Sequence, residues 1–152
     1  MSLDQKPLTI MGEKTPRVVI YKSESHKLHE AFCVKTGNKI IKGMPVALTD
    51  AGELVPYTAA TGQVYIGIAV TDNEHPAYSE QRNFPVEVTV MVEAYATCNY
   101  VSDAALKPGY VKPTGNVVSG HFVEVTQSTT ETKFVAITEA TGAHEVVRVL
   151  VR

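Results

Sequence analysis

Two histidines and a cysteine near the start of the chain have the spacing of metal ligands. His26 and His29 are three residues apart, and Cys33 follows four residues later. On one face of a helix, these three side chains would converge on a single zinc ion. A structural zinc site normally takes four protein ligands, and the sequence offers no fourth ligand at a suitable spacing. We therefore expect no metal site here and interpret the three residues as solvated polar groups.

Cys98 is the candidate nucleophile of the chain, because it follows directly on a predicted strand. A nucleophilic cysteine needs a base and an electropositive setting that holds the thiolate. The sequence leaves a pairing of Cys98 with His121 open. A lone cysteine is more often a small buried apolar side chain. We interpret Cys98 in that way and predict that the protein is not an enzyme.

Glu87 and Glu93 fall on one predicted strand, and paired carboxylates can hydrolyse glycosidic bonds. Six residues of extended chain separate them by roughly 20 Å, which is too far for that chemistry. The chain also lacks the Gly-x-Ser-x-Gly turn of hydrolases and any glycine-rich phosphate loop. The sequence therefore predicts no catalytic residue and no bound cofactor.

The composition limits the classes of partner. The 152 residues suit one domain, or one domain with an arm, and the formal charge is −2. Nucleic-acid binding proteins cluster Lys and Arg to contact phosphates, whereas the basic residues here are scattered. No apolar run approaches the roughly 20 residues that span a bilayer, and the N-terminus does not resemble a signal peptide. We expect a soluble protein made in a cytoplasm, with no nucleic-acid or membrane partner.

Short apolar runs separated by Gly, Pro, Asp and Asn dominate the chain after residue 30. Such runs at intervals of roughly 8–12 residues are typical of small β-sandwiches and barrels. The clearest run is 86–96, where valines at the even positions alternate with Glu87, Thr89, Met91 and Glu93. The predicted strands are 31–34, 39–41, 45–49, 53–57, 64–71, 86–96, 122–127, 134–138 and 146–152.

One segment, 102–107, predicts a short helix. Ser102 is a suitable N-cap, and Pro108 with Gly109 would stop the helix after about one and a half turns. The sequence shows no internal repeat. We therefore predict an all-β fold, a small β-sandwich or partly open β-barrel with one short helix, preceded by an extended N-terminal arm.

The first thirty residues differ from the rest, since they are polar and include Pro7 and Pro16. We predict an extended arm at 1–30 and a β-rich domain at 31–152. An arm of this kind can become ordered on a partner by adding a strand to the partner's sheet. The predicted partner-binding residues are Arg17, Val18, Val19, Ile20 and Tyr21.

The order of the turn and strand motifs resembles that of the head decoration, or capsid cement, proteins of tailed bacteriophages. In that family a small β domain carries the order Gly-x-Pro-Val-x-Leu, Gly-x-Leu-x-Pro and Ile-Gly-Ile-Ala, followed by a valine-rich strand and a short helix. The resemblance covers about residues 31–106. The matching stretches are KGMPV at 42–46, GELVP at 52–56, GIA at 67–69, the alternating valines of 86–92 and VVRVL at 146–150.

The resemblance implies a structural virion protein on the capsid surface, made in the host cytoplasm. It implies the major capsid protein as partner and a homo-trimer on the shell. A head fibre or vertex protein of the virion is an alternative, and a carbohydrate-binding β-sandwich is another. The loop at 72–85 has no counterpart in the family pattern, so its role stays open.

Overall fold

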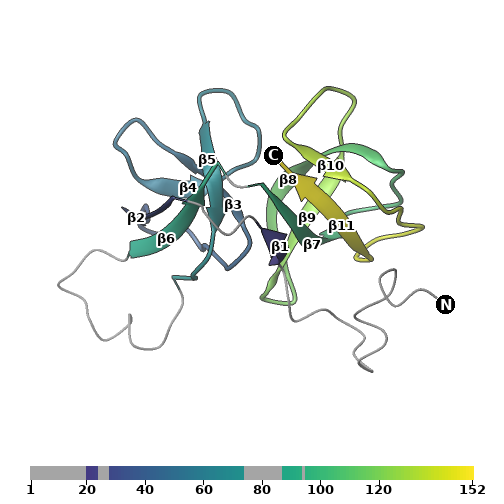
Figure 1. Cartoon of the computed structure of the whole chain (residues 1–152), viewed down its shortest axis with the longest axis horizontal. Helices are drawn as coiled ribbons and strands as arrows, with labels where there is room; N and C mark the ends of the chain where they lie inside the picture. Colours follow the sequence, from purple (N-terminus) through teal and green to yellow (C-terminus); the bar gives the residue numbers. More distant parts are fainter. Residues whose placement is uncertain (1–19, 24–27, 74–86, 94) are drawn as a thin grey trace.

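The computed structural model describes residues 20–23, 28–73, 87–93 and 95–152, and every regular element in this part of the chain is a β-strand (Figure 1). The predicted all-β fold is therefore confirmed. The strands form two sheets. They are β1 (Ile20–Ser23), β2 (His29–Cys33), β3 (Pro45–Leu48), β4 (Leu54–Pro56), β5 (Val64–Ala69), β6 (Glu87–Val92), β7 (Ala96–Ser102), β8 (Gly109–Val118), β9 (Phe122–Gln127), β10 (Phe134–Ala136) and β11 (Val146–Val151).

Strands β7 to β11, which we call the second unit, close into a five-stranded barrel. The order around the barrel is β7-β11-β10-β8-β9, and β9 returns to β7 through a short parallel pairing. The other four pairings are antiparallel. Closure removes the exposed edges that an open sheet would present. β1 lies outside this ring and pairs with the start of β7.

Strands β2 to β6, which we call the first unit, form a five-stranded antiparallel sheet in the order β2-β6-β5-β3-β4. A single parallel bridge joins Val34, just after β2, to Leu54 at the start of β4. The two ends of the sheet therefore meet, and the first unit is a partly open barrel. Figure 1 shows the two units side by side, with the first on the left of the view.

The two units have the same connectivity. In each unit, the spatial order of the strands is first, fifth, fourth, second and third, and the third strand returns parallel to the first. The hydrogen bonds at the parallel closure also correspond. The Lys35 N–H donates to the Leu54 carbonyl at 3.0 Å, and the Asp103 N–H donates to the Val125 carbonyl at 3.0 Å. The two units therefore have the same barrel topology, which we call the repeated barrel plan.

A side-chain hydrogen bond is repeated as well. The Thr71 hydroxyl accepts from the Thr89 N–H at 3.0 Å, and the Thr138 hydroxyl accepts from the Arg148 N–H at 2.9 Å. Both threonines follow the fourth strand of their unit and bind the middle of the fifth. The prediction of no internal repeat is therefore corrected. The repeat lies in backbone register and hydrogen bonding, which a comparison of residue letters does not detect.

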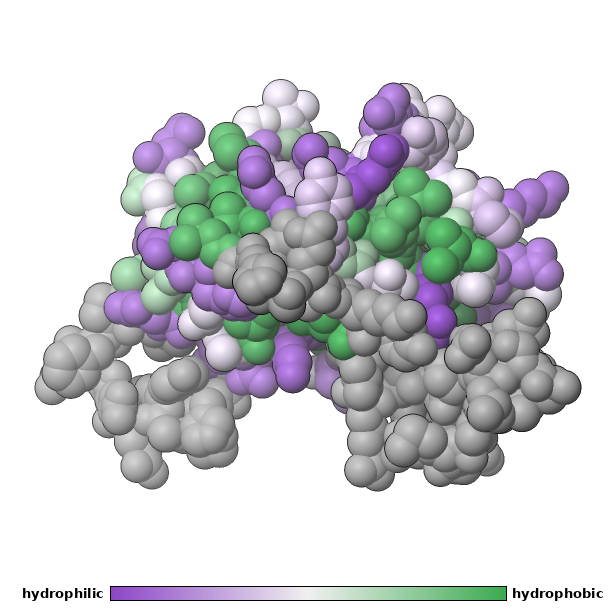
Figure 2. Space-filling model, viewed as in Figure 1, coloured by the Kyte–Doolittle hydropathy of each residue, from purple (hydrophilic) through white to green (hydrophobic). Residues whose placement is uncertain are grey.

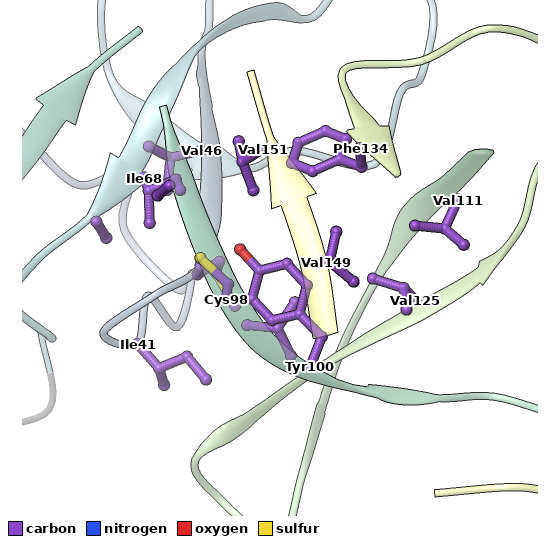
Figure 3. Close-up of a cluster of buried hydrophobic side chains, with 14 of the residues drawn as sticks. Ile41, Val46, Ile68, Cys98, Tyr100, Val111, Val125, Phe134, Val149 and Val151 are labelled. Carbon is purple, nitrogen blue, oxygen red and sulfur yellow. The ribbon is translucent and has the colours of Figure 1, made fainter. Parts of the chain in front are cut away.

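The buried residues of both units form one continuous hydrophobic core (Figure 3). Val88 and Val90 in β6 are fully buried, as the alternating pattern predicts, and Glu87 is exposed. Met91 breaks the alternation, because it lies on the opposite face of β6 and is only 2% exposed. Both faces of this part of the first unit are therefore buried.

The predicted helix at 102–107 is wrong. Ser102 ends β7, and its hydroxyl donates to the Gly142 carbonyl at 2.8 Å rather than capping a helix. Leu106 pairs with Ala140 through hydrogen bonds in both directions. An isolated helix of one and a half turns has little stability of its own, so pairing with a neighbouring segment prevails. Pro108 lies in a bend that leads into β8, which begins at Gly109.

Two strand predictions also need correction, and the sequence did not predict β7 and β8. The run at 86–96 is divided, because Glu93 adopts φ +48°, a left-handed conformation that ends an extended strand. The segment 39–41 is not a strand, although Ile40 is fully buried. β8 was not predicted, since Pro113 and Gly115 interrupt its apolar pattern. An irregularity in its pairing with β9, between Pro113 and Val117, accommodates them.

The boundary between an arm and a β domain at residues 30 and 31 stays a prediction. β1 and the first two residues of β2 precede that boundary and already pair with strands of the two sheets. Residues 1–19 and 24–27 lie outside the described part of the chain, as does most of the loop at 72–85.

Candidate interaction surfaces

The end of the predicted partner-binding segment belongs to β1. Ile20 pairs with Cys98 in β7 and is half-buried against the core, and Tyr21 follows it in the strand. Arg17, Val18 and Val19 lie outside the described residues. β1 is the outermost strand of its sheet in the described part of the chain. An outermost strand presents backbone groups to which a further strand can be added.

A second surface is the outward face of β8, β10 and β11, which we call the outer apolar face. Its apolar members are Tyr110, Val135, Ile137 and Leu150, and Arg148 lies on the same side of β11 as Leu150. Val135 pairs with Tyr110 on one side and with Leu150 on the other, so the three side chains form a row across neighbouring strands. Leu150 is 39% exposed and Ile137 is 51% exposed. Figure 2 shows apolar atoms gathered over β10 and β11, on the right of the view.

A third surface is a shallow polar groove of about 630 Å³ at the turn-bearing end of the first unit, where Gly115 of β8 also lines it. Gln63 organises this end. Its Oε1 accepts from the Thr58 N–H at 2.9 Å, and its Nε2 donates to the Pro56 carbonyl at 3.1 Å. The groove offers hydrogen-bonding side chains but no aromatic ring. Its lining comprises Lys35, Asn38, Leu48, Thr49, Asp50, Val55, Pro56, Thr58, Thr61, Gly62, Gln63 and Gly115.

Cys98, the candidate nucleophile, lies in the core between the two units. Burial raises the pKa of its thiol to about 12, and a hydrogen bond with Tyr100 lowers it only in part. A thiol with this pKa stays protonated at neutral pH, and the thiolate is the nucleophilic form. His121 lies in the exposed turn between β8 and β9, with its ring against Phe122. The geometry at Cys98 is that of a packing residue.

The other candidate groups are spread over the described part of the chain. His29 and Cys33 lie in β2, Glu87 begins β6, and Glu93 follows the last residue of β6. His26 is outside the described residues. Among residues 20–23, 28–73, 87–93 and 95–152, no three His, Cys, Asp or Glu side chains gather as metal ligands would.

Sequence reasoning missed a buried carboxylate in β9. Glu124 is only 8% exposed, and its Oε1 accepts from the Thr114 hydroxyl at 2.8 Å and from the Asn116 side chain at 3.0 Å. Its Oε2 lies 3.4 Å from Nε2 of His144. These partners come from separate strands and turns, so nothing in the order of residues indicated the cluster. The hydrogen bonds offset the cost of burying the carboxylate.

No protein-family model matches this chain, and neither does any curated protein. In the part of the chain that the structure describes, no helix is long and apolar enough to cross a membrane.

Proposed function

We propose that this protein binds the outer surface of a bacteriophage capsid and stabilises it, as a decoration protein without enzymatic activity or a cofactor. The observation that carries the proposal is the pairing of β1 with β7, which places the end of the predicted partner-binding segment at the edge of a β body. In this proposal, residues 17–21 bind an exposed strand of the major capsid protein, next to the outer edge of β1. Strand addition of this kind supplies directional backbone hydrogen bonds.

The continuous core of the two units fits a rigid protein that bridges neighbouring coat subunits. A protein that binds the closed shell, and not its separated subunits, stabilises the shell by the free energy of binding. In this proposal the protein is made in the host cytoplasm, forms a homo-trimer on the capsid and contacts neither nucleic acid nor membrane. The motif order in the sequence supports the same role.

Truncation tests the role of the N-terminal segment. A chain lacking residues 1–19 keeps β1, so we expect it to unfold at the same urea concentration as the full chain. We expect it to lose co-sedimentation with purified capsids that lack their own decoration protein. Equal binding of the truncated and full chains, with both folded, would show that this segment does not bind the shell.

Copy number separates decoration from a fibre or vertex role. Quantitative mass spectrometry of purified particles should give a copy number near that of the coat protein if the protein covers the shell. A much smaller number would indicate vertices or a fibre, and absence from the particles would contradict both virion roles.

The polar groove favours a second candidate, a carbohydrate-binding module. Side chains such as Asn38 and Asp50 offer hydrogen bonds to sugar hydroxyls, and a few placed polar groups commonly fix a ligand's orientation. The absence of aromatic rings from the lining argues against this candidate, because rings supply much of the apolar contact in binding sites. Glycan binding by the isolated protein that Asp50→Ala abolishes would support it.

A further inference from the structure

The first strand of each unit has two edges, and the repeated barrel plan allows them to be compared. One edge pairs with the fifth strand of the unit, which is β6 for β2 and β11 for β7. The other edge meets the third strand only at its far end. There, β2 reaches β4 through Val34, and β7 reaches β9 through Val101 and Ser102. In both units, the near end of this second edge is therefore not paired by the barrel itself.

β1 occupies this position in the second unit. It lies antiparallel beside residues 96–98, at the near end of β7. The closing hydrogen bonds make Lys35 the equivalent of Asp103, and counting back along both strands makes residues 28–30 the equivalent of 96–98. In the part of the chain that the structure describes, no strand pairs with β2 at this edge. Figure 1 shows β1 between the two units and β2 at the outer side of the first unit.

This edge of β2 is exposed to solvent. Leu28 is 61% exposed, and Glu30 and Ala31 are exposed as well. Cys98, the equivalent of Glu30, is fully buried and pairs with Ile20 of β1. An added strand thus covers the edge in the second unit, and the same edge of the first unit is open.

The backbone of β2 is oriented to bind a strand at this edge. The Leu28 carbonyl accepts a hydrogen bond of 2.9 Å from the Val92 N–H. Hydrogen-bonded and non-hydrogen-bonded pairs alternate along an antiparallel ladder, so Glu30 also directs its backbone groups toward β6. Ala31 then directs its N–H and its carbonyl away from β6, to the open edge. These two groups can bind an added strand through backbone hydrogen bonds.

The side chains of this edge indicate the chemistry of the added strand. Leu28, Glu30 and Phe32 lie on the side of β2 that meets the buried valines of β6. A strand added there would meet an apolar, an acidic and an aromatic side chain in turn. Apolar pairs and pairs of opposite charge across neighbouring strands stabilise a sheet. The edge therefore suits a strand that places a basic residue opposite Glu30, with apolar residues two positions to either side.

The charge of Glu30 also argues against a second copy of β2 as the added strand. Charged side chains on edge strands are a common device against edge-to-edge pairing of identical copies. A segment with the opposite charge does not meet this repulsion.

We propose that the open edge of β2, residues 28–32, binds an extended segment of a partner protein in which a basic residue lies between two apolar residues at alternate positions. The segment runs antiparallel to β2 and extends the sheet of the first unit, as β1 extends the other sheet beside β7. This site goes beyond the proposed capsid role and does not depend on it, because the edge belongs to the folded body of the isolated protein.

Amide NMR spectra of the full chain test the site with two synthetic peptides. The basic peptide is Thr-Val-Thr-Lys-Thr-Val-Thr with blocked ends, and the acidic peptide has Glu in place of Lys. We expect the basic peptide, at millimolar concentration, to shift the amide signals of residues 28–32. It should bind about fivefold more tightly than the acidic peptide, as an exposed ion pair allows.

Two variants and a control assign the binding to this edge. Ala31→Pro removes the outward N–H and leaves the ladder to β6 intact, so it should abolish binding of both peptides. Glu30→Lys should reverse the preference, so that the acidic peptide binds more tightly. The control is Glu87→Lys, a charge reversal at an exposed position of β6 outside this edge, which should bind both peptides like the wild type. Circular dichroism checks that each variant is folded.

Three results would overturn the proposal. The first is that neither peptide shifts the signals of residues 28–32. The second is that folded Ala31→Pro binds the basic peptide as the wild type does, or that Glu30→Lys keeps the wild-type preference. The third is that the same signals shift with rising protein concentration alone, which would assign the edge to a second copy of the chain.

Discussion

The Tyr100 hydroxyl donates a hydrogen bond of 2.7 Å to the backbone carbonyl of Gly43 and so joins the second unit to the first. Both groups are buried, and Tyr100 is 0% exposed. Tyr100→Phe keeps the ring but leaves the Gly43 carbonyl without this donor. An unsatisfied buried acceptor costs about 1–3 kcal/mol, so we expect the free energy of unfolding to fall by about that much in urea titrations.

Tyr110→Phe is the matched control, because Tyr110 is half-buried on the outer apolar face. A change of less than about 0.5 kcal/mol is expected there, as for most surface substitutions. Equal effects of the two substitutions would show that the bond to Gly43 adds no particular stability.

The period of two in β6 supports a second prediction. Val90 is 0% exposed and Glu87 is exposed, as the alternation indicated. Val90→Asp buries an unpaired charge and should lower the free energy of unfolding by several kcal/mol, enough to leave much of the protein unfolded. Glu87→Lys should leave the urea midpoint unchanged. Reversed effects would mean that the register of β6 is shifted by one residue.

Alternation of apolar and polar residues identified strands whose outer face meets solvent, as in β11. It failed where both faces are covered. Met91 lies at an outward-facing position of β6 but is buried, because it packs in the core with residues from another part of the chain. β8 was missed for a related reason, since its Pro113 and Gly115 are tolerated only because the pairing with β9 is irregular there.

The interaction surfaces were harder to predict than the fold. The extended nature of Ile20 and Tyr21 was apparent from the sequence, but the pairing of Ile20 with Cys98 in β7 brings together residues nearly eighty positions apart. The outer apolar face likewise joins residues from β8, β10 and β11 that no local pattern connects. The repeated barrel topology could not be recognised from the residue types, because residues at equivalent positions differ. For example, Gly67 in β5 is equivalent to Phe134 in β10.

Gly67 supports a third prediction, because its backbone permits no side chain. Its φ is +153°, and a Cβ atom would collide with the backbone carbonyl of Met91 in the neighbouring strand. Gly67→Ala should therefore push β5 away from β6 and cost about 1–3 kcal/mol or more, measured by thermal and urea unfolding. Gly142→Ala is the control, since its Cβ would meet only the flexible end of the Glu145 side chain. A loss at Gly142 as large as that at Gly67 would contradict this explanation.

The buried thiol of Cys98 predicts how stability changes in alkali. Burial raises its pKa to about 12, whereas an unfolded cysteine titrates near 8.5. Above about pH 8.5 the unfolded chain therefore releases a proton that the folded chain keeps, so the free energy of unfolding falls as pH rises toward 12. Burial also raises the pKa of Tyr65 and Tyr100, but unfolded tyrosines titrate only near pH 10.

Urea titrations between about pH 8.5 and 10 should thus show a decline in the free energy of unfolding that Cys98→Ala reduces. An unchanged slope in Cys98→Ala would show that this thiol ionises as readily in the folded chain as in the unfolded one.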